Sequence, residues 1–162
     1  MIVSNKKILF VLVIVLLYLI IAGMQKPNLL TEKDLFITEN LLSRYEVNNY
    51  KSSVSVVSVK TSENVSIGID TDPERLNFGA IPIDSISKRF VNITNLRKSD
   101  VKVSIEVTGN IKPFVAFDKN DFILNDNELA SVIIYFNSTN ADVGNYSGNI
   151  YIIMEGSKYD FF

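Results

Sequence analysis

A run of sixteen residues without a charge, from Ile8 to Gly23, constrains this chain of 162 residues more than any other feature. Two lysines precede the run directly. As a helix, residues 8–24 would extend about 26 Å, just under the ~30 Å of hydrocarbon in a bilayer. A helix satisfies its own backbone polar groups in lipid. The run therefore predicts a transmembrane helix over residues 8–24, preceded by a cytoplasmic tail over residues 1–7.

A cleaved signal peptide is the alternative, because it also has a basic start and an apolar centre. That centre is usually only ~7–15 residues long. The possible cleavage sites lie around Ala22 and Gly23, where Ile20 or Ile21 would occupy a position that prefers a small residue. Both observations favour an uncleaved anchor, and either reading sends the C-terminal part of the chain across the membrane.

The positive charges beside the run indicate its orientation. Lys6, Lys7 and the α-amino group precede it, whereas Lys26 and Lys33 follow it, which is a slight bias toward a cytoplasmic N-terminus. We therefore expect a single-pass protein of the cell membrane with an extracytoplasmic C-terminal domain. Such a domain could be glycosylated at four Asn-x-Ser/Thr sequons, which give weak support because this composition produces several by chance: Asn64, Asn92, Asn137 and Asn145.

Composition excludes several classes of function. The chain has no Cys and no His, so disulfides and thiolate nucleophiles are absent, as are the commonest general base and zinc ligand. After the apolar run there are 14 Lys and Arg against 18 Asp and Glu, with no basic cluster longer than two residues. Nucleic acid and anionic lipid headgroups are therefore poor candidate partners. We expect a protein that is not an enzyme and that has no cofactor, no metal and no small-molecule substrate.

Carboxylates cluster once, over residues 118–128. A calcium loop would need a ligand in place of Phe122 and a glycine at its turn, and the sequence has neither. An opportunistic calcium site and a catalytic carboxylate pair are the alternatives. The preferred interpretation is two polar turns that flank a short strand over residues 122–124.

The stretch over residues 25–51 is expected to be juxtamembrane. Thr31-Glu-Lys-Asp34 has the spacing of a capping box, and the apolar residues that follow fall roughly on one helical face: Leu35, Leu41, Leu42 and Tyr45. This predicts a short helix from about Glu32 to Tyr45. An irregular stalk is the alternative.

From Ser52 the period changes to that of β-strands. Residues 54–59 and 65–69 predict a hairpin, and residues 101–107 alternate regularly between apolar and polar. Turn signals recur every ~8–12 residues, as in a β-sandwich. The pattern predicts a mainly β ectodomain over residues 52–162, with further strands over residues 75–78, 81–83, 87–95, 114–117, 122–124, 129–136, 146–154 and 158–162.

Asp142-Val-Gly144-Asn-Tyr146 has the Asp-x-Gly-x-Tyr spacing of the tyrosine corner of Greek-key sandwiches. There the phenol hydrogen-bonds the backbone near the start of its loop. We therefore expect Tyr146 to fix this corner, and a binding aromatic is the alternative.

Three segments in this order resemble one family: Arg75-Leu-Asn-Phe78-Gly79, Lys88-Arg-Phe-Val-Asn-Ile-Thr-Asn95 and Gly144-Asn-Tyr-Ser-Gly148. Together they are similar to the immunoglobulin-like domains of the ASH, hydin and major-sperm-protein group and to their prokaryotic secreted relatives. The resemblance covers residues 72–154 and implies an immunoglobulin-like Greek-key β-sandwich, a scaffold or interaction module, in a membrane-anchored prokaryotic protein, more narrowly an archaeal one. The chain departs from the pattern at Leu96-Arg-Lys-Ser99, so this loop is differently shaped or carries a contact of its own.

These features predict a non-enzymatic single-pass membrane protein whose extracytoplasmic domain binds another protein in a surface or membrane complex. A filament- or envelope-associated part, stator-like or pilin-like, is one alternative, although Ile8 follows Lys7 where a pilin needs a small residue. An accessory subunit of a membrane enzyme is another. The apolar end of the chain, Phe161 and Phe162, is a possible partner edge, unless it folds back on the core.

Overall fold

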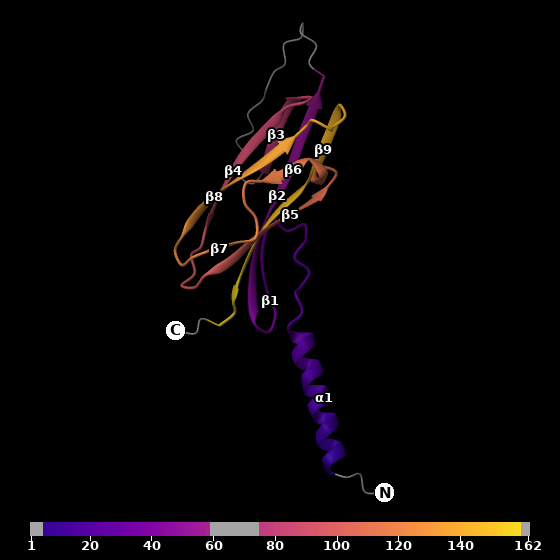
Figure 1. Ribbon diagram of the computed structural model, residues 1–162, viewed down its shortest axis with the longest axis vertical. Helices are drawn as coiled ribbons and strands as arrows, with labels where there is room; N and C mark the ends of the chain where they lie inside the picture. Colours follow the sequence, from indigo (N-terminus) through magenta and orange to yellow (C-terminus); the bar gives the residue numbers. More distant parts are fainter. Residues whose placement is uncertain (1–4, 59–74, 160–162) are drawn as a thin grey trace.

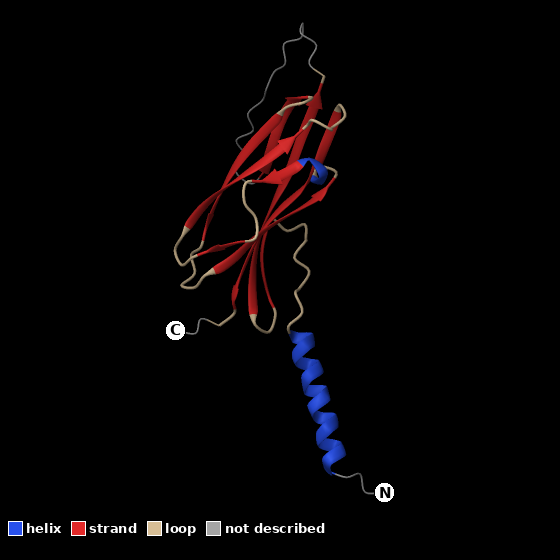
Figure 2. Ribbon diagram, in the orientation of Figure 1, coloured by secondary structure: helices blue, strands red, loops and turns tan. Residues whose placement is uncertain are grey.

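The computed structural model describes residues 5–58 and 75–159, which form a mainly β structure with one N-terminal α-helix (Figures 1 and 2). The helix α1 spans Asn5–Gly23. The strands and one short 3₁₀ helix follow as β1 Leu35–Glu39, β2 Ser43–Val57, β3 Arg75–Pro82, β4 Ile86–Thr94, β5 Val101–Gly109, η1 Lys112–Phe114, β6 Val115–Phe117, β7 Phe122–Leu124, β8 Leu129–Asn137 and β9 Gly144–Ser157.

The strands form two sheets, an arrangement consistent with the expected β-sandwich. The larger sheet has the order β1-β2-β9-β5-β7, with β3 parallel to the C-terminal half of β2, and the smaller has the order β4-β8-β6. Alternating side chains from both sheets, such as Val103 and Ile152 from one and Val132 and Phe136 from the other, are buried together in the main core. Strand β2 precedes the region of family resemblance, so the large sheet is completed by a strand from outside it.

The large sheet is buried on its outer face as well. There Tyr45, Val47, Tyr151 and Ile153 form a second apolar cluster, which is covered by Leu29 from the segment that joins α1 to β1. Backbone hydrogen bonding fixes this segment, since the Asn49 amide nitrogen donates to the Asp34 carbonyl at 2.6 Å. The connector is therefore part of the folded domain.

The turn between β1 and β2 contacts the C-terminal end of α1. The Leu41 amide donates to the Gly23 carbonyl at 2.7 Å, and the Asn40 side-chain amide donates to the Met24 carbonyl at 3.1 Å. The same Asn40 side chain accepts from the Ser43 amide at 2.7 Å. One asparagine thus shapes the turn and ties it to the end of the helix.

The helix expected over residues 8–24 is present as α1. Within the part of the chain that the structure describes, no helix has the length and apolarity that crossing a membrane requires. The structure supports the helix, and it does not support the predicted span.

The predicted juxtamembrane helix from Glu32 to Tyr45 is wrong. Those residues form β1, the Asn40 turn and the start of β2, so the β domain begins well before Ser52 and the stretch over residues 25–51 is not a stalk. The physical reason is tertiary pairing, because β2 joins β1 on one side and β9 along almost its whole length on the other. Those backbone bonds outweigh a weak helical spacing of leucines.

Most of the other predicted strands are present with shifted ends. Residues 75–78 and 81–82 belong to one strand, β3, which passes through Gly79 at a φ of 78° and pairs with β2 across a bulge, and Ile83 lies in the turn that follows. The described residues of the strand expected over 158–162 are not a strand. The predicted partner strand over residues 65–69 lies outside the described residues, as do Asn64, Phe161 and Phe162.

Candidate functional site

Tyr146 makes the hydrogen bond predicted for it. Its hydroxyl donates to the Asp142 carbonyl at 2.8 Å, and its half-buried ring packs edge-on against Phe114 at 4.9 Å between centroids. The space around residue 144 does not require a glycine, because a Cβ atom there would meet nothing within 4 Å. The Asp142–Tyr146 motif therefore holds the loop that enters β9.

The carboxylates over residues 118–128 serve the turns, in line with the preferred interpretation. The Asp118 carboxylate accepts from the Ile133 amide at 2.8 Å, Asp121 pairs with Lys102 at 3.1 Å, and Glu128 accepts from the Asn125 amide at 2.8 Å. Strand β7 separates the two turns at the predicted residues. Among the described residues no group of three or more potential ligands is placed to hold a metal ion.

The three described sequon asparagines lie at the surface. Asn92 is exposed in β4, Asn137 accepts a hydrogen bond from the Thr139 amide at 3.0 Å, and Asn145 accepts one from the Ser55 hydroxyl at 2.7 Å. Their accessibility fits the prediction, and their modification remains a prediction.

The outer face of the small sheet exposes large apolar side chains. Phe90 of β4 is 66% exposed and lies opposite Ile133 of β8, with exposed Ile86 and Leu129 farther along the same strands. The Lys88 ammonium lies 5.5 Å from the centre of the Tyr135 ring on this face. We call this surface the Phe90 face.

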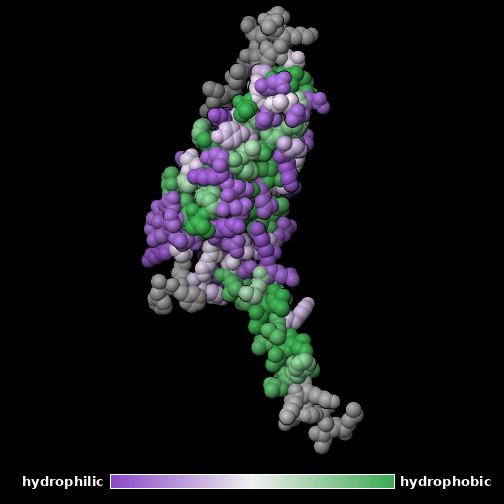
Figure 3. Space-filling view, in the orientation of Figure 1, coloured by the Kyte–Doolittle hydropathy of each residue, from purple (hydrophilic) through white to green (hydrophobic). Residues whose placement is uncertain are grey.

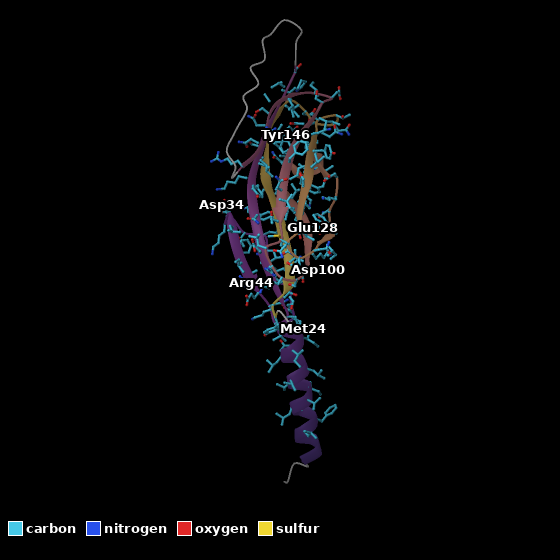
Figure 4. The ribbon with its side chains drawn as sticks, turned by 90° about the vertical axis from the view of Figure 1, so that its left-hand side faces the viewer. Met24, Asp34, Arg44, Asp100, Glu128 and Tyr146 are labelled. Carbon is cyan, nitrogen blue, oxygen red and sulfur yellow. The ribbon has the colours of Figure 1, made fainter. Side chains whose placement is uncertain are left out.

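A groove of about 1030 Å³ lies at the end of the domain that contacts α1. It is lined by four cationic side chains, Arg44 of β2, Arg97 and Lys98 of the β4–β5 loop, and Lys158 after β9, and by one carboxylate, Glu46. We call it the basic groove. Figure 4 shows Arg44 in the half of the domain next to Met24, with Tyr146 toward the far end.

The loop that carries Arg97 is fixed by a buried asparagine. The Asn95 side-chain amide donates to the carbonyls of Ser99 at 2.8 Å and Asn125 at 2.9 Å, and its oxygen accepts from the Arg97 amide at 3.0 Å. Asn95 is only 2% exposed, so its side chain makes these bonds from inside the domain to the backbone of the two loops. The backbone of Arg97 is therefore held in one position.

The guanidinium of Arg97 lies over Gly156 of β9. A Cβ at residue 156 would come within 2.6 Å of Arg97 Nη1, so glycine makes room for the side chain there. Both terminal nitrogens, Nη1 and Nη2, are buried and have no hydrogen-bond partner among the described residues. Leaving a buried cation without an acceptor is costly, so this position calls for an anion.

Two other cations of the basic groove share one carboxylate on β1. Glu39 lies 3.8 Å from Arg44 Nε and 3.1 Å from Lys158 Nζ. All three side chains remain partly exposed, so the pairs are screened by water. Glu39 orients the two cations beside the groove.

Two tyrosines of β2 have raised pKa values. Burial is the main cause of the raised pKa of Tyr45. Glu155, whose carboxylate accepts a hydrogen bond from the Tyr45 hydroxyl at 3.0 Å, raises this pKa further, while hydrogen bonds with Ser43 and Asn40 act in the opposite direction. Burial alone raises the pKa of Tyr50. Both phenols therefore stay neutral at physiological pH and play a structural part.

The basic groove was missed by sequence reasoning. Its cations come from three separate segments, so no basic run marks them. The one local signal was the departure of Leu96-Arg-Lys-Ser99 from the family pattern, which allowed for a contact of its own. Comparison with protein families, with curated proteins and with solved structures finds no match to this chain.

Proposed function

We propose that this chain is a non-enzymatic, single-pass membrane protein with a cytoplasmic N-terminus, whose extracytoplasmic immunoglobulin-like domain binds another protein. The observation that carries the proposal is the apolar surface of α1. Its side chains from Leu9 to Ile21 are apolar and exposed on every side, up to 67% for Phe10 and 70% for Tyr18. Figure 3 shows this apolar helix below a mostly hydrophilic domain. A helix that is hydrophobic all round is stable where lipid or other helices cover it.

The length of the apolar run bears on how α1 would be held. Sixteen uncharged residues extend about 24 Å as a helix, which is shorter than the ~30 Å hydrocarbon core. A short span is accommodated when the bilayer thins locally or when flanking lysines reach toward the headgroups. Lys6 and Lys7 stand where such anchoring residues are needed.

Binding to another protein is supported by the domain's surface and by its resemblance. The two packed sheets, and the passage of the chain from β3 in one to β4 in the other, fit the immunoglobulin-like Greek-key interpretation. The family in question consists mostly of scaffolds and interaction modules. Exposed aromatic and aliphatic side chains on the Phe90 face provide a contact surface of the kind found at protein interfaces.

The anchor is tested in native membranes. We expect the full chain to resist alkaline carbonate extraction, to begin near Met1 by mass spectrometry, and to lose its β domain when intact cells are treated with protease. A mature N-terminus near Met24, or release by carbonate, would overturn the anchor.

The binding role is tested by crosslinking in the same membranes. We expect one neighbouring protein to be crosslinked in the wild type and in Val143→Ser, which removes another well-exposed apolar side chain, 57% against 66% for Phe90, outside the Phe90 face. Phe90→Ser should abolish that crosslink. A crosslink that connects only copies of α1 would instead favour the filament-associated alternative.

A further inference from the structure

We propose that the basic groove binds the phosphate headgroup of an anionic membrane lipid. The inference rests on the proposed membrane attachment of α1 and adds a ligand that the sequence had disfavoured. The sequence shows no basic cluster longer than two residues, but the fold brings Arg44, Arg97, Lys98 and Lys158 to one groove.

Arg97 gives the strongest reason for an anion. A guanidinium presents its donors in a planar fork that matches the oxygens of a phosphate or carboxylate. Both outer nitrogens of this fork are buried and unpartnered within the described chain, while Asn95 holds the backbone and Gly156 leaves room for the side chain. Arg97 as a residue is partly exposed and lines the groove, so a rotation of its side chain brings the fork to an anion bound there.

The charges around Arg97 favour a phosphate. Four cations line the groove against one carboxylate, Glu46, and a second carboxylate, Glu39, lies beside Arg44 and Lys158. Counting both carboxylates, the cations remain in excess by two. A headgroup phosphodiester carries a negative charge and presents two oxygens to a forked donor.

The position of the groove favours a lipid over a free phosphate. The Lys158 amide donates to the Leu42 carbonyl at 2.8 Å, and the adjacent residue, Leu41, donates to the last residue of α1, Gly23, at 2.7 Å. The segment after β9 that lines the groove is therefore joined to the end of α1 through the turn between β1 and β2. Figure 1 shows the C-terminal ends of β9 and α1 at the same end of the domain. If α1 is embedded in a bilayer, this end of the domain lies at the level of the headgroups, where basic side chains attract anionic lipids.

The test uses the full chain in a nonionic detergent, titrated with short-chain lipids and followed by phosphorus NMR. Dihexanoyl-phosphatidylglycerol should bind saturably, and dihexanoyl-phosphatidylcholine and inorganic phosphate should bind at least about tenfold more weakly. Arg97→Gln should weaken phosphatidylglycerol binding about tenfold or more, which corresponds to one charge-assisted contact. Arg97→Lys, which keeps the charge and loses the fork, should fall between Arg97→Gln and the wild type.

Lys112→Gln is the matched control, because it removes one positive charge from η1, outside the groove. It should bind like the wild type, and all variants should keep the wild-type melting temperature within a few degrees. Equal binding of inorganic phosphate would overturn the lipid in favour of a free oxyanion, and equal binding by Arg97→Gln would overturn the site. Carbonate extraction is scored separately, so a failure of the anchor is distinguishable from a failure of the groove.

Discussion

Replacing Tyr146 by Phe removes one oxygen atom from the loop that enters β9 and leaves the ring in place. The ring contacts with Phe114, at 4.9 Å, and Phe136, at 6.1 Å, are available to Phe as well. The lost interaction is therefore the 2.8 Å hydrogen bond to the Asp142 carbonyl. A typical intramolecular hydrogen bond contributes about 0.5–1.5 kcal/mol, and an acceptor left unpaired in the interior costs more.

The exposure of Asp142 decides where in this range the loss of stability in Tyr146→Phe should fall. Asp142 is exposed, so water can reach its carbonyl in the variant, and we expect a loss of about 1 kcal/mol. For a domain of this size that corresponds to a fall of roughly 4 °C in melting temperature. Tyr146→Ala should cost clearly more, about 2–3 kcal/mol, because the ring contacts are lost as well.

Urea denaturation of the full chain in nonionic detergent measures these changes in stability. Each appears as a shift in the urea concentration at the midpoint of unfolding, with no change in the dependence of the free energy of unfolding on urea. Tyr135→Phe is the matched control, since it also removes a phenol oxygen while its ring can keep the contact with Lys88 on the surface. We expect its midpoint to stay within error of the wild type. A midpoint for Tyr146→Phe that is equally unchanged would refute the structural role of the Asp142 hydrogen bond.

Three further outcomes are expected. Arg97→Met should raise the free energy of unfolding by about 1–2 kcal/mol in the same assay, because it removes two buried unpartnered donors and keeps the apolar stem; a lower midpoint would contradict this. Asn95→Ala should lower the free energy of unfolding by about 2–4 kcal/mol, because several hydrogen bonds of a buried side chain are lost together; a loss below 1 kcal/mol would mean that water replaces them. Stability should fall as pH rises above about 10, because Tyr45 and Tyr50 then lose their protons in the unfolded chain, whereas the folded phenols, whose pKa values are raised, retain them; Tyr45→Phe should reduce this pH dependence in part, and an unchanged slope would exclude a contribution from Tyr45.

The strands that sequence located best are those with one buried face. In β5, Val101, Val103 and Ile105 are buried and alternate with more exposed polar residues, so the pattern alone predicted the element. The central strand β9 differs, since all residues from Ile150 to Met154 are buried. Such a continuous apolar run signals a strand covered on both faces, and it could have predicted that another segment packs on the outer side of the sheet.

The predicted juxtamembrane helix failed because the sequence around it permits two structures. The leucines at positions 35, 41 and 42 can share a helical face, yet Tyr45 and Val47 also alternate with polar neighbours as in a strand. Only the presence of β9, about a hundred residues later, decides between them. The basic groove depends on the same long-range pairing, because Arg44 and Lys158 meet where the ends of β2 and β9 come together.

This correction changes how the domain would be presented at a membrane. A stalk over residues 25–51 would hold the sandwich away from the bilayer, whereas the observed connector buries Leu29 against Tyr151 and Ile153. The Asn40 turn then ties the end of α1 to the base of the large sheet. With no long tether, a membrane-embedded α1 would orient the domain so that the face nearest the helix meets the headgroups. The basic groove lies at this end, whereas Tyr146 lies toward the opposite end (Figure 4).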